Sequence, residues 1–313
     1  MDGKVLALAG GTGGAKLALG LARVLPPEQL VIVVNTGDDE CFHGLHVSPD
    51  LDTIMYTLAG LVNQETGWGL AGDTFKALGM LRKYDVDTWF NLGDLDLATH
   101  VRRTQLLGQG LSLSQVTNEL CRRLGVEHQV VPMSDGPVRT VLSTGGGDLP
   151  MQTYFVRHGS EPKVSSIAYV GAESAEASPS FSAAIAESDL VVFCPSNPFL
   201  SVGPILAVPG VRENMAQEPS SQLRVVVSPI VGGAAIKGPA AKIMSELGHE
   251  VSCVGVAKIY QDICDVFVID QQDAHLAPEI ERIGMKPMVT PTIMNTEADK
   301  IALARLILQL KGN

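Results

Sequence analysis

The chain has 313 residues, of which 45% are hydrophobic and 18% are charged, so it can bury a core and is not disordered. Acidic residues outnumber basic ones by 34 to 23, a net charge of −11, and aromatic residues make up only 5%. Such a surface repels polyphosphate backbones and offers few stacking platforms, which excludes nucleic acid as a partner. A small phosphate ligand can still bind through backbone amides or a divalent metal.

The sequence gives no sign of export or of membrane insertion. We find no secretory signal, and no stretch approaches the roughly 20 apolar residues of a membrane span. The five cysteines are odd in number, widely spread and contain no CxxC pair, which disfavours a disulfide framework and a structural zinc site. We therefore expect a soluble protein of the reducing cytoplasm, without a membrane partner.

Short β-branched runs alternate with segments of helical period over most of the chain. This alternation predicts an α/β fold, a Rossmann-like doubly wound and mostly parallel sheet covered on both faces, within a single domain over 1–313. The expected strands are Val5–Leu8, Leu30–Asn35, Leu190–Cys194, Arg224–Ser228, Val251–Val256 and Val266–Ile269. The expected helices are Ala15–Leu25, Asp52–Val62, Asp73–Lys83, Leu113–Leu124, Phe181–Glu187, Pro239–Leu247 and Thr296–Leu310.

One region departs from the alternation. Three strand-like runs follow one another, separated by glycine, proline and aspartate, at Gln129–Met133, Arg139–Ser143 and Gln152–Val156. Such separators indicate hairpins and not crossover helices. We predict a small β-rich insertion at about 134–164, near the substrate site. The alternative is a mixed edge of the main sheet.

A glycine-rich loop follows the first strand. Gly10, Gly11, Thr12, Gly13 and Gly14 lead directly into a helix that carries Lys16. Glycines let a phosphate approach the backbone, and a helix N-terminus offers unpaired N–H groups. The loop is neither the dinucleotide fingerprint, whose third glycine is replaced by lysine, nor a P-loop. It predicts a phosphate or nucleotide site; the alternative is only a tight first turn.

Pairs of aspartates follow at three later loops. Asn35, Thr36 and Gly37 precede Asp38-Asp39, and Asp50 and Asp52 lie in Ser-Pro-Asp-Leu-Asp-Thr, where one of them could instead cap a helix near Thr53. After a short expected strand at Trp89-Phe90 come three further polar positions and a histidine, which are Asn91, Asp94, Asp96 and His100.

Loops of this kind line the carboxyl edge of a parallel sheet, where ligands bind. Carboxylates gathered there repel one another unless a cation or protons neutralise them. Oxygen-ligated Mg²⁺ bridging to phosphate is the simplest interpretation, whereas no histidine pair has zinc-ligand spacing. His100 either contacts phosphate or makes a hydrogen bond at a helix end.

Two loops after later strands add polar groups. Ser196 and Asn197 lie between prolines, and Ser201 and Gly203 follow shortly. A rigid turn of this kind can present an amide to a base or a ribose. Lys237 and Gly238 follow another strand and could place a positive charge near a ligand. Alternatively, the residues of each loop could serve only to form a turn.

Taken together, these residues resemble the CofD/FbiA family, the 2-phospho-L-lactate (or phosphoenolpyruvate) transferases of coenzyme F-420 biosynthesis. The resemblance rests on Gly10–Lys16, Asn35–Asp39, Ser48–Thr53, Gly93–His100, Pro195–Pro198 and Ser201–Ile205, with further matches from residue 4 to about residue 300. It implies that a guanosine diphosphate-linked acid (2-phospholactyl, enolpyruvyl phosphate or 3-phosphoglyceryl) gives its phospho-acid moiety to the ribityl hydroxyl of the deazaflavin Fo, releasing GMP. It also implies Mg²⁺ and a homodimer.

On this basis we expect Asp39 and Asp52 to act on the metal and the hydroxyl, with Asp38 as a further metal ligand. Asp50 supports them, and the glycine loop binds the nucleotide. The family commonly has arginine where this chain has Leu95, which removes a cation from the site region. Two other functions stay open at this point. One is a nucleotide- or UDP-sugar-binding regulator without turnover, and the other is a nicotinamide-linked oxidoreductase, which Lys16 disfavours.

Overall fold

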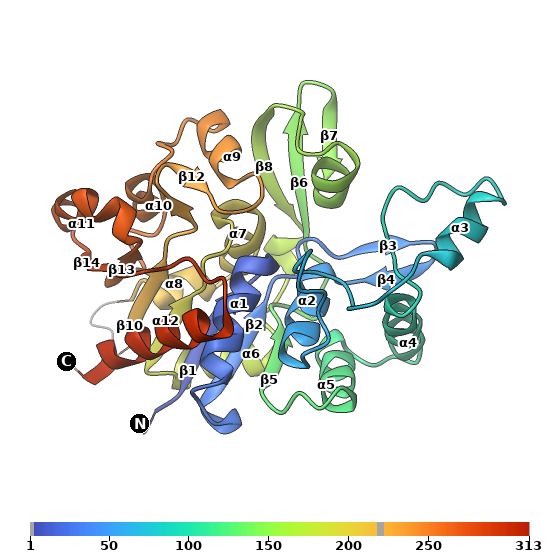
Figure 1. The fold of residues 1–313 in the computed structure, drawn as a ribbon, viewed down its shortest axis with the longest axis horizontal. Coiled ribbons are helices and arrows are strands. Elements are labelled where there is room, and N and C mark those ends of the chain that lie inside the picture. Colours follow the sequence, from blue (N-terminus) through green and yellow to red (C-terminus); the bar gives the residue numbers. More distant parts are fainter. Residues whose placement is uncertain (1–2, 218–221, 313) are drawn as a thin grey trace.

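The computed structural model describes residues 3–217 and 222–312; the remaining residues of the expected domain, 1–2, 218–221 and 313, lie outside the description. At its centre is a seven-stranded sheet in the order β14-β13-β10-β9-β1-β2-β5, in which every pairing is parallel (Figure 1). The predicted doubly wound fold is confirmed. The strands are β1 (Val5–Ala9), β2 (Leu30–Val34), β5 (Gln129–Pro132), β9 (Leu190–Phe193), β10 (Leu223–Val227), β13 (Val266–Ile269) and β14 (Lys286–Val289).

The sheet is buried on both faces. Alternate residues of β1 enter two different cores, Ala7 and Ala9 on one side and Leu6 and Leu8 on the other. This is why its strands are continuous apolar runs and not alternating ones. One face packs against α1 (Gly11–Ala22), α2 (Pro49–Leu58), α5 (Leu113–Arg123) and α12 (Glu297–Gln309). The other packs against α6 (Pro179–Glu187), α7 (Gly203–Leu206), α8 (Val211–Met215), α9 (Ala240–Glu246), α10 (Cys253–Ile259) and α11 (Ala277–Arg282).

The strand order fixes where a ligand can bind. Chain connections run from β1 to β2 and β5 on one side and return to β9, β10, β13 and β14 on the other. The direction of winding therefore reverses between β1 and β9. In open parallel sheets, ligands bind at the carboxyl ends of the strands beside such a reversal. The glycine loop follows β1, and the Pro195-Ser196 turn follows β9.

A second, three-stranded antiparallel sheet packs beside this edge (Figure 1). Its order is β7-β6-β8, with β6 at Arg139–Thr144, β7 at Gly147–Pro150 and β8 at Val164–Val170. The last of these strands begins at the end of the interval predicted for the insertion, 134–164, and continues past it. The predicted strand Gln152–Val156 is wrong, because Thr153–Arg157 is a helical turn with Tyr154 fully buried.

Two further expectations from the same signals are corrected. Gln129–Pro132 pairs in parallel with β2 as an edge of the main sheet, so it does not form a hairpin with Arg139–Ser143. Val251–Val256 is not a strand: Ser252 accepts a hydrogen bond from the Gly255 amide and begins α10. The first five residues of α10 are all buried, so no polar face marks its period there.

An arm extends from the sheet between β2 and β5 (Figure 1). It holds the hairpin of β3 (Glu40–Phe42) and β4 (Leu45–Val47), and the helices α3 (Lys76–Arg82) and α4 (Asp96–Gly108). The expected Trp89-Phe90 strand is wrong, because these residues lie in irregular chain whose rings pack on Phe42. A hairpin of β11 (Ile230–Val231) and β12 (Ala234–Ala235) completes the strands of the described chain. Within the described ranges, no helix is both long enough and apolar enough to cross a bilayer.

Candidate functional site

A cavity of about 580 Å³ lies at the carboxyl edge of the main sheet, between the arm, the small sheet and the β11–β12 region. Most of the predicted site residues meet there, although they come from loops far apart in the sequence. Those that line it are Gly10, Gly11, Thr12, Gly13, Lys16, Asp38, Asp50, Asp52, Asn91, Asp96, His100, Ser196, Asn197 and Ser201.

The other predicted site residues do not line the cavity: Gly14, Asn35, Thr36, Gly37, Asp39, Asp94 and Gly203. Three of them are glycines where a side chain would meet neighbouring structure. A Cβ on Gly14 would come 2.6 Å from Ser196 Oγ, and one on Gly37 would come 2.6 Å from Thr140 Oγ1. At Gly203 a Cβ would meet the Tyr169 hydroxyl. Close packing accounts for these three glycines.

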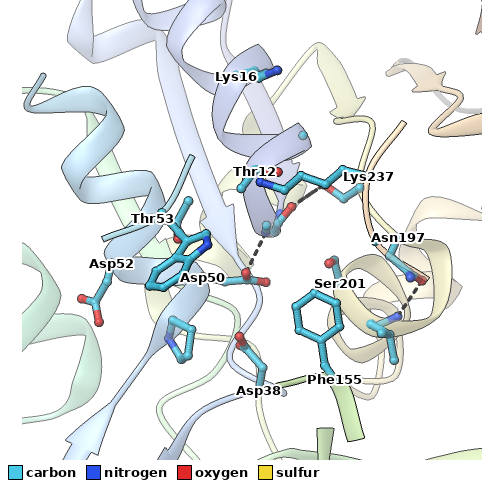
Figure 2. A pocket seen from close by; sticks show the side chains of 18 of the residues that line it. Thr12, Lys16, Asp38, Asp50, Asp52, Thr53, Phe155, Asn197, Ser201 and Lys237 are labelled. Carbon is cyan, nitrogen blue, oxygen red and sulfur yellow. Dashed lines mark hydrogen bonds between the residues drawn. The ribbon is translucent and has the colours of Figure 1, made fainter. Parts of the chain in front are cut away.

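The glycine loop is held by two neighbouring loops. The Gly10 amide donates to Ser196 Oγ at 3.2 Å, and this hydroxyl donates to the Gly10 carbonyl at 2.8 Å. The Gly11 amide donates to Asp50 Oδ1 at 2.7 Å, so a carboxylate already satisfies the first amide of α1 (Figure 2). A Cβ on Gly13 would lie 2.3 Å from the Pro195 carbonyl, which explains the glycine there.

Asp38 and Asp50 share one neutral donor. The Asn35 side-chain amide donates to Asp50 Oδ2 at 2.9 Å and to Asp38 Oδ1 at 3.2 Å. Burial raises the pKa of Asp50 to about 6, although hydrogen bonds from Asn35 and the Gly11 amide oppose the shift. Burial, together with the charges of Asp50 and Asp39, raises the pKa of Asp38 well above its ordinary value. A bound proton or a cation could therefore balance the charge of these two carboxyls.

Asp39 is buried next to this pair but does not line the cavity. Its Oδ2 accepts from Ser48 Oγ at 2.8 Å and lies 3.0 Å from His46 Nε2. Its Oδ1 is buried and has no hydrogen-bond partner among the described residues. Neither Asp50 nor Asp52 caps α2, because that helix begins at Pro49 with Ser48 at the N-cap and both aspartates lie in its first turn.

Asp52 is neutralised by a cation that the sequence interpretation did not include. Arg103 of α4 donates to both carboxylate oxygens of Asp52, with its Nη1 at 3.1 Å from Oδ2. Burial opposes the positive charge, but Asp52 outweighs it and raises the pKa of Arg103. The ligand atoms of Asp52, Asp96 and His100 lie close enough together to hold a metal, yet Arg103 already supplies the positive charge that Asp52 needs.

Asp94 has a structural role at the base of the arm. Its carboxylate accepts from the amides of Lys76 and Ala77 at the start of α3. Asp73 does the same for α4, accepting from the amides of Leu95 and Asp96. These two reciprocal caps hold the two helix starts together. The Leu95 side chain is 55% exposed and does not line the cavity.

Several lining residues were not selected from the sequence. Gln152, at the start of the helical turn after β7, donates to Asp38 Oδ2 at 3.2 Å. Lys237 lines the cavity near Thr12 (Figure 2), and its ammonium donates to the Thr66 carbonyl. The remaining walls are mostly apolar and include Trp68, Phe90, Met151, Phe155, Ile236 and Thr292–Asn295. Of these residues, Lys237 carried a sequence signal, because it lies in a loop that follows a strand.

Comparison with known proteins identifies the family of this chain. The family model for the 2-phospho-L-lactate transferase CofD matches residues 5–303. The chain belongs to the CofD family. A phosphoenolpyruvate transferase of Kitasatospora aureofaciens is 41% identical over 98% of this chain and 97% of its own length. A 2-phospho-L-lactate transferase of Methanothermobacter thermautotrophicus is 39% identical over 97% of both chains.

A solved structure shares the fold of this CofD family member. It is a protein of the UPF0052 family from Bacillus halodurans, with a TM-score of 0.63 and 17% identity over 98% of this chain and 99% of its own. At that identity the likeness concerns the fold alone. The curated relatives are transferases, so the chain is a member of a transferase family, and the resemblance recognised in the sequence is confirmed. Relatives named for two different phospho-acids match it at similar identity.

Proposed function

We propose that this CofD family member transfers a phospho-acid moiety from its guanosine diphosphate conjugate to the ribityl hydroxyl of the deazaflavin Fo, releasing GMP, in coenzyme F-420 biosynthesis. The donor class covers 2-phospholactyl, enolpyruvyl phosphate and 3-phosphoglyceryl conjugates. The observation that carries the proposal is the cavity at the winding reversal of the sheet, where a glycine loop and a group of buried carboxylates meet an apolar wall. The glycine loop suits the diphosphate of the donor, the carboxylates suit a metal ion, and the apolar wall suits the flat ring of Fo.

The donor set of the cavity fits Mg²⁺. Asp38 and Asp50 are both at least 90% buried, line the cavity and share a single neutral donor, so their charges are not balanced within the protein. The orphaned Oδ1 of Asp39 lies close behind them. Carboxylate oxygens are the ligands that Mg²⁺ prefers. We assign Asp38 and Asp50 as the residues that would hold the ion, which when bound would neutralise charge on the donor diphosphate.

The roles first assigned to Asp39 and Asp52 are refined by their contacts. Both had been expected to act on the metal and the hydroxyl. Asp39 lies behind the cavity wall, so we propose that it supports the metal ligands from there. Both oxygens of Asp52 accept hydrogen bonds from Arg103. We therefore propose that Asp52 affects the substrate indirectly, by positioning Arg103 and His100.

Two lysines provide positive charge near the glycine loop. Lys16 and Lys237 both line the cavity, and burial together with the charge of Lys16 lowers the pKa of Lys237. Gly67 lies next to both groups, because a Cβ built on it would be 3.1 Å from Thr12 Cγ2 and 3.5 Å from Lys237 Nζ. The Lys237 ammonium is therefore close to Thr12 of the glycine loop. Two ammonium groups that repel each other favour an anion between them. We propose that the donor phosphates bind there.

The apolar side chains of the cavity wall suit the deazaflavin. Trp68, Phe155 and Ile236 are 44%, 39% and 52% exposed, although each is a large apolar side chain on the cavity wall. Figure 2 places Phe155 near the Asp38 end of the cavity. Exposed apolar side chains around a concave site are typical of surfaces that bind an apolar ligand. We propose that they cover the tricyclic ring of Fo.

Binding of Fo tests the proposal, because the deazaflavin is fluorescent. Titrating purified protein into Fo should give saturable polarisation, and Trp68→Ala should weaken binding while the exposed Tyr84→Ala leaves it unchanged. Tyr84 is a suitable control because it is a large exposed ring outside the cavity lining. Tight binding of a UDP-sugar without any Fo signal would contradict the proposal and favour a regulator.

A further inference from the structure

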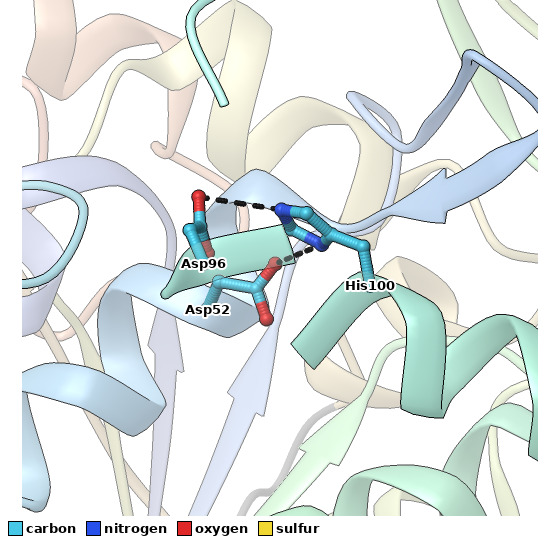
Figure 3. Close-up of side chains that lie close together, drawn as sticks. All are labelled: Asp52, Asp96 and His100. Atoms are coloured by element: carbon cyan, nitrogen blue, oxygen red, sulfur yellow. Dashed lines mark ion pairs between the residues drawn. The ribbon is translucent and has the colours of Figure 1, made fainter. Parts of the chain in front are cut away.

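His100 has an unused polar atom at the cavity. The side chain is 1% exposed, yet it belongs to the cavity lining. Its Nε2 lies 3.3 Å from Asp96 Oδ2, and it makes no hydrogen bond of good geometry with any described residue (Figure 3). A buried polar nitrogen normally has a partner, and leaving it without one is unfavourable. A bound group would therefore supply a partner that the protein does not.

Arg103 determines which ring nitrogen carries the proton. Its Nη1 lies 3.3 Å from His100 Nδ1 while also donating to Asp52 Oδ2. A guanidinium has only donors, so the Nδ1 facing it must present its lone pair. A ring with one proton then carries it on Nε2. His100 is thus a hydrogen-bond donor toward Asp96 and the cavity.

Asp96 is the matching acceptor. Its Oδ1 accepts from the Tyr56 hydroxyl at 2.7 Å, which leaves Oδ2 for a second partner beside His100 Nε2. Its side chain is 13% exposed and lines the cavity. The backbone amide of Asp96 is capped by Asp73, which fixes the start of the helix that carries both residues. The donor and the acceptor are therefore held on adjacent turns of α4.

We propose that Asp96 and His100 form a subsite for an alcohol hydroxyl of the substrate, which accepts from Nε2–H and donates to Oδ2. A hydroxyl can do both at once, whereas a phosphate or carbonyl oxygen can only accept. Arg103 and Asp52 are positioning residues that hold the ring in this tautomer. The inference rests on the proposed function, which supplies two polyols: the ribityl chain of Fo and the ribose of the guanine nucleotide.

A binding cycle with deoxygenated ligands tests the subsite. Fo and its analogues lacking one ribityl hydroxyl each form one arm, and GDP with 2′-deoxy-GDP and 3′-deoxy-GDP forms the other. In the parent protein one deoxygenated ligand should bind on the order of 10- to 100-fold more weakly, the scale of a hydrogen bond to a charged group. Which arm shows the loss identifies the polyol.

Three variants make the cycle specific. His100→Leu removes the donor and should abolish the difference between the hydroxylated and deoxygenated ligand. His100→Gln keeps an N–H near the position of Nε2 and should retain much of it. His158→Leu is the matched control, because His158 is exposed and does not line the cavity. Equal binding of every deoxygenated ligand by the parent would overturn the proposal, as would a loss that persists in His100→Leu.

The tautomer provides an independent measurement that needs no ligand. Long-range ¹H–¹⁵N spectra of the parent, with His100→Gln used to assign the signal, should show a protonated Nε2 and an unprotonated Nδ1. A proton on Nδ1 would overturn the arrangement. If the parent fails to bind Fo at all, the proposed function fails, whereas the tautomer and the nucleotide arm still decide the subsite.

Discussion

Asp52 and Arg103 form a buried ion pair that joins the first turn of α2 to α4. The guanidinium donates to both carboxylate oxygens, and the side chains are only 7% and 2% exposed. The pair connects the cavity wall to the arm and is more than a surface contact. It also means that Asp52 cannot be changed without leaving a buried cation unpaired.

Removing one partner of this pair should therefore destabilise the protein. Arg103→Met should lower the free energy of unfolding by about 3–5 kcal/mol, because Asp52 is left charged and buried. The double variant Arg103→Met with Asp52→Leu should recover much of that loss, since both charges are then gone. Urea denaturation of the single and double variants measures the difference.

Arg23→Met is the control for this prediction. Its ion pair with Glu297 has side chains 45% and 53% exposed, and such surface pairs contribute about 0–1 kcal/mol. A loss of less than 1 kcal/mol in Arg103→Met, equal to that of the control, would show that the buried pair does not stabilise the fold as described.

A side chain at Gly13 should disturb the loop whether or not a nucleotide is present. The added Cβ would lie 2.3 Å from the Pro195 carbonyl, so the turn after β9 must move. Gly13→Ala should lower the melting temperature of the ligand-free protein. Gly79→Ala, in α3 with open space around the new Cβ, should leave it unchanged or raise it slightly. Equal melting temperatures for Gly13→Ala and the parent would contradict the close approach.

Protonation of Asp50 should make the metal-free protein more stable in acid. The pKa of Asp50 in the folded protein is about 6, above its ordinary value of 3.8, so the folded state binds this proton more tightly. Its contribution is complete below about pH 4 and is lost as the pH rises through about 6. In EDTA, Asp50→Asn should therefore gain stability over the parent between pH 4 and pH 7, by at most about 3 kcal/mol. A constant difference across this range would contradict the assignment.

Magnesium should raise the melting temperature through Asp38 and Asp50. A cation that binds only the folded state at 100 times its Kd adds about 2.7 kcal/mol, which corresponds to a shift of several degrees. The shift should be lost in Asp38→Asn and kept in Asp148→Asn, a control at an exposed position of the small sheet. Equal shifts in both variants would place the ion elsewhere.

Much of the fold follows from local sequence, because buried parallel strands are short β-branched runs that alternate with helices. The exceptions have physical reasons. Val251–Val256 is valine-rich, but a helix begins at Cys253, and its first five residues are all buried, so no polar face shows the helical period there. Gln129–Pro132 was grouped with the hairpins because glycine, proline and aspartate follow it. In the structure it pairs in parallel with β2 at the edge of the main sheet.

The site was predictable where loops follow strands and not where distant elements meet. Asp38 and Asp50 were selected because the carboxyl ends of parallel strands converge at one edge. Arg103 neutralises Asp52 from 51 positions away, and Gln152 reaches Asp38 from 114 positions away. A local sequence pattern cannot reveal contacts between residues so far apart in the chain. Asp94 resembled a ligand in sequence but caps α3, because caps and ligand sites use the same residue types.

Turnover tests the central claim most directly. Purified protein is incubated with Fo, Mg²⁺ and, in separate reactions, each of the three guanosine diphosphate-linked acids, and products are followed by liquid chromatography and mass spectrometry. The account predicts that at least one donor yields one GMP for each Fo consumed, together with a product whose mass equals Fo plus the phospho-acid moiety. Unchanged Fo and no GMP with all three donors, from folded protein, would contradict it.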